Sequence, residues 1–107
     1  MKPPARIKVG HLSYEVALTP AADMGDNNAD VDHEDLMIRI NAALAPGAQA
    51  EKLVHEALHC CWDSWKIGPR WGEEKVVTAL APAMCAVIRD NPELVAWLQW
   101  TLSEGEG

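Results

Sequence analysis

The sequence lacks several features that define common protein classes. It has no phenylalanine and three cysteines, and no stretch approaches the roughly 18 apolar residues that span a bilayer. Nine lysines and arginines face 16 aspartates and glutamates, which gives a formal net charge of −7. Because nucleic acids and anionic lipids bind proteins through positive surfaces, we expect neither kind of partner. The N-terminal residues contain no signal-peptide core, so a cytoplasmic protein is expected.

The cysteines do not form the regular pattern of a disulfide framework. Cys60 and Cys61 are adjacent, and Cys85 is the odd third residue. An odd count without regular spacing predicts reduced, mostly buried thiols. In the absence of phenylalanine, we expect the five tryptophans to supply core volume.

The chain has the size and composition of one globular domain. It contains 107 residues, of which 49% are hydrophobic and 23% charged. Chains of this length form a single core, and this composition is not that of a disordered protein. We therefore expect one domain over residues 1–107, with an ordered core over about 7–102 and a frayed tail at 103–107.

The N-terminal half has the pattern of short strands. Apolar residues alternate on both sides of Gly10 over residues 7–18, which predicts two strands and a turn. Residues 19–35 are rich in Pro, Asp, Asn and Gly and show no periodicity, so a loop is expected. Alternation resumes over residues 36–41, which predicts another strand.

The C-terminal half has helical periodicity. Apolar residues from Pro46 onward recur at helical spacing until Gly68-Pro69, which predicts a four-turn helix. A second helix is expected from about Gly72-Glu73, with a kink or break at Pro82. A third should begin with Asn91 as N-cap and run to about residue 102. Together these elements predict an α+β fold, in which a small antiparallel or mixed sheet packs on a helical layer.

The first predicted helix contains the motif His55-Glu56-Ala57-Leu58-His59. Histidines four residues apart lie on one helix face, where both imidazoles can bind a single Zn²⁺. The glutamate of such a motif is the usual general base for hydrolysis. On a helical wheel both histidines lie on the flank of an apolar stripe centred near Ala57 and Cys61.

A zinc site of this type needs a third protein ligand. The connection after the first helix is long enough to return the start of the second helix to the histidines. Glu74 lies on the flank of the second helix and is favoured as ligand, with Glu73 as the alternative. Asp63 is a further candidate, as a partner of a ligand or as the third ligand itself, although a solvated position suits it better. A ligand from Cys60 or Cys61 is disfavoured by their positions on the wheel.

The order of these features resembles small phage-encoded zincin-like metallopeptidases, related to ImmA/IrrE and SprT-type minimal zincins. The resemblance covers residues 7–98 and is carried by the motif, the Gly-Pro break, the Glu73-Glu74 start of the second helix and the segment over 90–94. It implies a zincin-like minimal metallopeptidase fold. It also implies His55 and His59 as zinc ligands with a glutamate of the Glu73-Glu74 pair, and Glu56 as catalytic acid/base.

Three functions are consistent with the sequence. The first is zinc-dependent hydrolysis of a peptide bond, with His55, His59 and Glu74 holding the zinc and a protein or peptide substrate lying along residues 36–41 if that strand is an edge. The second is a non-catalytic, zinc-stabilised interaction or regulatory module of a phage. The third is a metal-free helical adaptor that presents Trp97 and Trp100. The donors available to stabilise an oxyanion are His11, Tyr14, His33 and Arg70.

Overall fold

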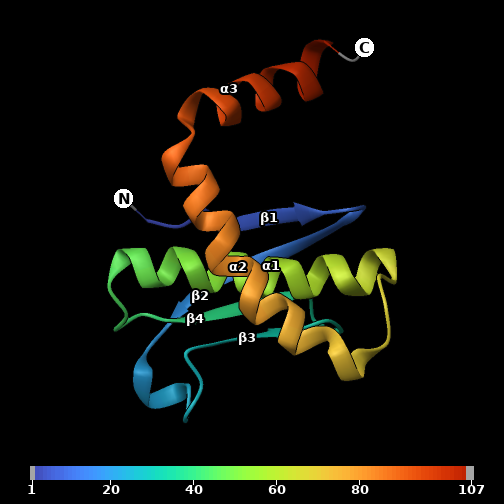
Figure 1. Cartoon of the computed structure of the whole chain (residues 1–107). Helices are drawn as coiled ribbons and strands as arrows, with labels where there is room; N and C mark the ends of the chain where they lie inside the picture. Colours follow the sequence, from blue (N-terminus) through green and yellow to red (C-terminus); the bar gives the residue numbers. More distant parts are fainter. Residues whose placement is uncertain (1, 106–107) are drawn as a thin grey trace.

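A computed structural model describes residues 2–105 of the chain and has an α+β fold. Four strands form one mixed sheet in the order β1-β2-β4-β3. The strands are β1 (Arg6–Val9), β2 (Leu12–Thr19), β3 (Ala29–Asp32) and β4 (Met37–Asn41). Helix α1 (Pro46–Trp65) crosses the sheet, and α2 (Glu73–Asp90) crosses α1 in turn (Figure 1). The predicted α+β class and mixed sheet are confirmed.

The register of the sheet follows from one tight turn and one parallel pairing. Strands β1 and β2 form the expected hairpin, and Val9 pairs with Leu12 across a turn that contains Gly10. Gly10 has a φ of +64°, a left-handed conformation that glycine adopts without strain. Strand β2 then runs parallel to β4, and β3 pairs antiparallel with the other side of β4.

The core lies on one face of the sheet, beneath α1. Tyr14 of β2 and Ile38 and Ile40 of β4 are fully buried there, and Cys60 of α1 packs against them. The intervening residue of β4, Arg39, lies on the opposite, more open face, as the two-residue period of a strand requires. This single-sided core fixes which face of α1 is buried and therefore which face can bear a site.

Strand β3 was not predicted, because residues 19–35 carry the composition of a loop. Aspartate disfavours strands, yet β3 contains Asp30 and Asp32. A cross-strand ion pair compensates, since Arg39 Nε of β4 donates to Asp30 Oδ1 at 2.9 Å. The strand predicted over residues 36–41 is present as β4, but the condition that it be an edge strand is not met: β4 is internal, and β3 forms the edge of the sheet on that side.

Helix α1 begins and ends close to the predicted limits, but its buried face differs from the predicted stripe. Glu56 and Cys60 are its buried residues, whereas Ala57 and Cys61 are only partly covered. The sheet lies beneath the Glu56–Cys60 line, which hydrophobicity alone does not identify because it contains a glutamate. The three cysteines are free, as predicted, but only Cys60 is fully buried.

The tryptophans do not fill the core, which corrects that expectation. Trp65, Trp71, Trp97 and Trp100 are each between 59% and 90% exposed. Only Trp62 is substantially covered. Tyr14 and the β-branched residues of β4 supply the core volume instead.

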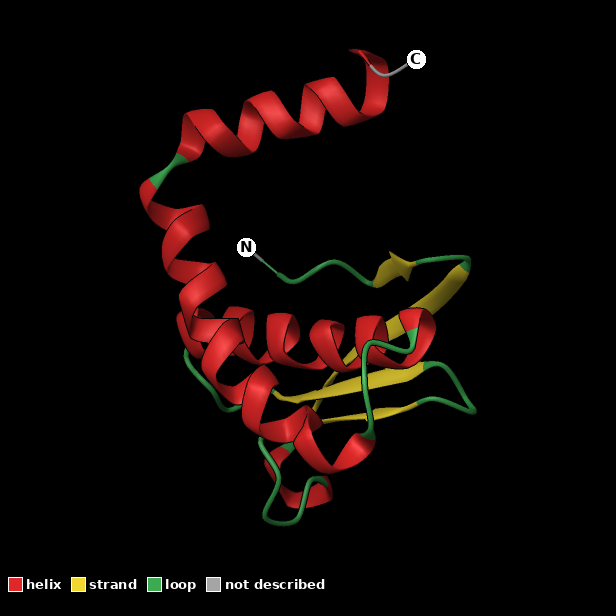
Figure 2. Cartoon of the chain, turned by 45° about the vertical axis from the view of Figure 1, so that its right-hand side comes forward, coloured by secondary structure: helices red, strands yellow, loops and turns green. Residues whose placement is uncertain are grey.

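The C-terminal helices extend beyond the sheet (Figure 2). Helix α2 continues through Pro82 without the break that was considered, and α3 (Pro92–Trp100) follows directly. Asn91 occupies the predicted cap position, but its side-chain amide donates to the Val87 carbonyl and caps no N–H group of α3. Thr101–Gly105 form a π-helical turn, so the frayed tail expected over 103–107 is still helical at its start, and residues 106–107 lie outside the described part. None of the described helices is both long and apolar enough to cross a membrane.

Candidate metal centre

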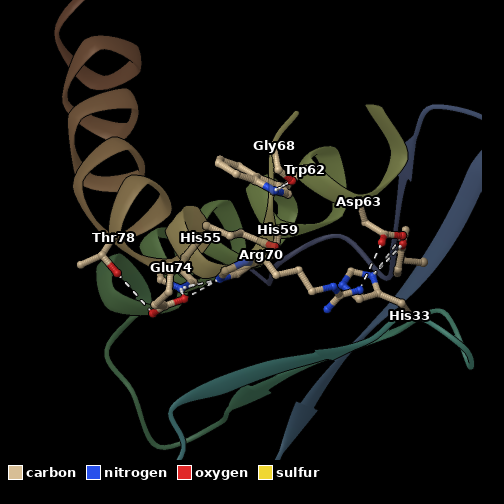
Figure 3. Close-up of polar contacts among 11 residues, drawn as sticks. His33, His55, His59, Trp62, Asp63, Gly68, Arg70, Glu74 and Thr78 are labelled. Atoms are coloured by element: carbon tan, nitrogen blue, oxygen red, sulfur yellow. Dashed lines mark hydrogen bonds and ion pairs between the residues drawn. The ribbon is translucent and has the colours of Figure 1, made fainter. Parts of the chain in front are cut away.

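The helical spacing of His55 and His59 brings their imidazoles together on the side of α1 that faces α2. The two Nε2 atoms lie 3.2 Å apart, and the ring centroids are separated by 4.9 Å (Figure 3). Both side chains are about 15% exposed. The two imidazole nitrogens, on adjacent turns of α1, are therefore close enough to bind the same metal ion.

Glu74, in the first turn of α2, supplies a third donor atom at this place. Its Oε1 lies 2.7 Å from His59 Nε2 and 3.4 Å from His55 Nε2. Tetrahedral zinc with bonds of about 2.0–2.1 Å separates its donor atoms by roughly 3.3 Å. Two of the observed separations, 3.2 and 3.4 Å, are close to that value and the third, 2.7 Å, is shorter, so His55, His59 and Glu74 form a group that could hold a metal ion.

Glu73 occupies a different position from Glu74, which separates the two glutamates that the sequence left as alternatives. Its Oε2 lies 2.6 Å from Nδ1 of His59, on the opposite side of the ring from Glu74. Its side chain is 12% exposed, against 69% for Glu74. A carboxylate that accepts the Nδ1 proton leaves the Nε2 lone pair of the same ring free for a metal.

Local contacts hold Glu74 and the start of α2 in place. Thr78 Oγ1, one turn further along α2, donates to Glu74 Oε2 at 3.2 Å. In the connection between the helices, Trp62 Nε1 donates to the Gly68 carbonyl at 2.8 Å. A Cβ atom at Gly68 would lie 3.1 Å from the Trp62 ring, so the close approach favours glycine there.

The electrostatics of the donors favour metal binding at neutral pH. Burial lowers the pKa of His55, so its imidazole is neutral and has a lone pair to share. Burial acts to raise the pKa of Glu74, but the nearby His55 and His59 outweigh it and the pKa is lowered. Neutral imidazoles and an ionised carboxylate are the forms that bind zinc.

Glu56 lies on the same helix between the two histidines but points toward the sheet. It is 6% exposed and has no hydrogen-bond partner within the described residues. Burial raises the pKa of Glu56 to about 7, against an opposing effect of His59. A carboxyl that is largely withdrawn from water and has a raised pKa is characteristic of functional sites.

The donors face a cavity of about 440 Å³ that opens beside the edge strand. Ala29, Asp30 and Val31 of β3 form one wall, and α1 and the first turn of α2 form the other. His33 and Arg70 also line this cavity. The site is therefore bordered by an edge strand that sequence analysis had not identified.

Of the other residues that the sequence singled out, Tyr14, Asp63 and Arg70 lie near His33. Tyr14 Oη and His33 Nδ1 share a hydrogen bond of 3.3 Å, and burial raises the pKa of Tyr14 to about 12. Asp63 Oδ1 lies 3.6 Å from Arg70 Nη2, and its Oδ2 lies 4.0 Å from His33 Nδ1 (Figure 3). Asp63 thus supports His33 and Arg70 and is not part of the metal-binding group; neither is a cysteine. His11, in the β1–β2 turn, does not line the cavity.

Two residues of the site were missed from the sequence. Thr78 follows Glu74 by four residues, a spacing that places both side chains on one helix face and could have suggested their contact. Asp30 lines the cavity beside Glu56, but no local signal marks the strand that carries it.

Comparisons with protein-family models, curated proteins and solved structures found no match for this chain.

Proposed function

We propose that this chain is a zinc-dependent metallopeptidase-like protein with a zincin-like fold. The observation that carries the proposal is the convergence of His55 Nε2, His59 Nε2 and Glu74 Oε1 at separations of 2.7–3.4 Å. Three protein ligands are typical of catalytic zinc sites, whereas structural sites usually have four. The described part of the chain offers no fourth donor in this group.

The chemistry available to the site is hydrolysis. When bound, zinc supplies a Lewis acid that lowers the pKa of water and polarises a carbonyl oxygen. Glu56 lines the same cavity and is placed to accept a proton from water at a carboxylate oxygen and to deliver it to a leaving amine. Its pKa near 7 suits both roles at neutral pH.

His33 and Arg70 support the proposal as hydrogen-bond donors. Both line the cavity, and the other two donors considered from the sequence do not, since Tyr14 and His11 lie outside its wall. A donor that faces the developing negative charge of an acyl-transfer transition state lowers the barrier by a few kcal/mol. Asp63 lies close to both residues, with its carboxylate oxygens 4.0 Å from His33 Nδ1 and 3.6 Å from Arg70 Nη2.

Strand β3 provides a binding mode for an extended peptide. It pairs with β4 on one side only, and three of its residues line the cavity. A peptide that adds to this edge places its backbone beside the metal-binding group. The substrate position proposed from residues 36–41 thus moves to Ala29–Asp32.

The test is the substitution Glu56→Gln in the zinc-loaded protein. Cleavage of casein and of a peptide library should fall by about 10²- to 10⁴-fold, while one equivalent of zinc remains bound by elemental analysis. Glu51→Gln, on the exposed side of the same helix, is the matched control and should retain activity. Equal cleavage by wild type and Glu56→Gln would exclude this mechanism.

The same experiment tests the non-catalytic alternative. A wild-type protein that binds one zinc, loses thermal stability on chelation and cleaves nothing in the library would favour a zinc-stabilised interaction module. Fractions purified without a histidine tag keep the metal analysis free of metal bound by the tag.

A further inference from the structure

The C-terminal arm, defined as residues 80–102, is apolar but contributes little to the core. Nine of the 14 large hydrophobic residues that the structure leaves exposed lie in it. After Ala81, no residue of α2 or α3 is fully buried. The exposed side chains of the arm are Leu80, Met84, Val87, Ile88, Leu94, Trp97, Leu98, Trp100 and Leu102. A patch of this extent marks an interaction surface.

Helix α3 exposes apolar side chains on more than one side. Among its nine residues, Pro92–Trp100, the polar side chains are Glu93 and Gln99. Helices that are apolar on all sides are found buried inside proteins. Here α3 packs on the end of α2 and stands away from α1 and the sheet (Figures 1 and 2). A flat partner would cover one side only, so a partner that encloses α3 fits better.

The chain also carries an apolar groove on the side of the molecule where α3 lies. This groove, between β1 and α1, has a volume of about 420 Å³. It lies at the β1 edge of the sheet, whereas the metal-binding group lies at the β3 edge. The apolar residues lining it include Ile7, Val9, Leu53, Val54, Ala57 and Trp65.

The charge of the arm permits a second copy of this chain as the occupant. The arm has Arg89 against Asp90 and Glu93, so it carries −1 of the total formal charge of −7. Arg89 and Asp90 are paired within the chain at 2.8 Å. Two acidic molecules can therefore meet through this face with little repulsion. A membrane surface is disfavoured, because helices that lie on membranes carry several basic residues.

The exposed area is sufficient for a stable dimer. At the exposures of the nine side chains, the arm presents on the order of 800 Å² of apolar surface, the amount that each partner of a standard interface buries. Twofold symmetry uses the same two surfaces on both copies and closes the assembly at two chains.

We propose that the C-terminal arm forms a symmetric homodimer, in which α3 of each copy lies between the arm and the β1–α1 groove of the other. The arm and the groove then cover α3 from two sides. The metal-binding group remains open at the opposite edge of the sheet, so dimer formation and zinc binding are independent.

The test is the solution mass of the full chain by light scattering after gel filtration, measured from 1 to 100 µM. We expect wild type to reach twice the 11.7 kDa of one chain, and Trp97→Glu/Trp100→Glu to remain at one chain at every concentration. Trp71→Glu, at a residue 90% exposed outside the arm, is the matched control and should remain dimeric. Circular dichroism and zinc titration check that each variant is folded.

A second variant tests the position of α3 on the groove. Val54→Glu introduces a charge into the groove at a residue of α1, outside the arm, and should also give a single chain. If Val54→Glu still forms a dimer, α3 does not bind in this groove, and that part of the proposal is wrong. A wild-type protein that stays at one chain at 100 µM, or that binds vesicles of neutral phospholipid through the arm, would overturn the proposal as a whole.

Discussion

The body of the molecule, residues 2–79, and the C-terminal arm contain similar kinds of apolar residue but use them differently. Seven of the eight buried hydrophobic residues belong to the body, and the arm contributes only Ala81. In the body, strand alternation and one crossing helix cover the apolar side chains. In the arm, two successive helices present them outward. Hydrophobic periodicity thus predicts that a helix has an apolar face but not whether the same chain covers it.

The largest expected difference between the two regions concerns stability. Ile40→Ala removes side-chain volume from a fully buried site in an internal strand, and should lower the free energy of unfolding by about 2–5 kcal/mol. Ile88→Ala makes the same chemical change in the arm, where the side chain is 47% exposed. In dilute protein its effect should be below about 1 kcal/mol. Urea unfolding compares the two, and equal losses would contradict the distinction between body and arm.

The ionisation of Glu56 should affect the stability of the metal-free body. Its folded pKa of about 7 lies above the usual value of 4.5, so the folded state binds more protons between these values and stability falls as pH rises through this range. Glu56→Gln removes this loss and should make the metal-free protein more stable at pH 8 by up to a few kcal/mol, but not at pH 4. Parallel stability profiles of wild type and Glu56→Gln from pH 4 to 8 would contradict the burial of this carboxyl.

Glu73 and Glu93 occupy the first turns of α2 and α3, so substituting each compares the zinc affinity of a variant beside the metal-binding group with that of a variant in the arm. Glu73→Gln weakens the contact that orients His59 and should reduce zinc affinity about 10- to 100-fold, or about 1.4–2.8 kcal/mol. Glu93→Gln removes the equivalent charge at the start of α3 in the arm and should leave affinity unchanged. Calorimetric titration measures both, and equal affinities would exclude the proposed role of Glu73.

The smallest effect is expected in the connection that joins α1 to α2. Trp62→Phe removes the hydrogen bond to the Gly68 carbonyl and should cost about 1 kcal/mol of stability. Trp71→Phe, two residues before Glu73 and 90% exposed, should cost almost nothing. Thermal unfolding of both variants, with and without zinc, shows whether this bond fixes the start of α2.

Much of the fold follows from local sequence signals. The turn at Gly10, the ends of α1 and the start of α2 were predictable, because tight turns and helix boundaries depend on residues close together in the chain. Strand β3 was not, because its two aspartates oppose a strand locally and Arg39 of another strand compensates for Asp30. The exposure of Trp97 and Trp100 entered only as one of three alternatives, because tertiary packing, and not local sequence, decides which apolar side chains are covered.

The candidate metal site, like the fold, was predictable from the sequence only in part. The spacing of His55 and His59 on one helix face requires only helical geometry. The positions of Glu73 and Glu74 depend on the angle at which α2 crosses α1, which the length of the connection limits without fixing. The cavity residues His33 and Arg70 come from separate connections, and no local pattern relates them to the motif.

Zinc titration of the metal-free chain at pH 7.5 tests the metal centre most directly. The arrangement of His55, His59 and Glu74 predicts one equivalent of bound zinc in wild type. It also predicts that both His55→Ala and Glu74→Gln lose more affinity than the about 10- to 100-fold expected for loss of a contact to a ligand, with no change in Glu93→Gln. A wild-type protein that binds no zinc, or a His55→Ala/His59→Ala double variant that binds it as tightly as wild type, would contradict the metal centre.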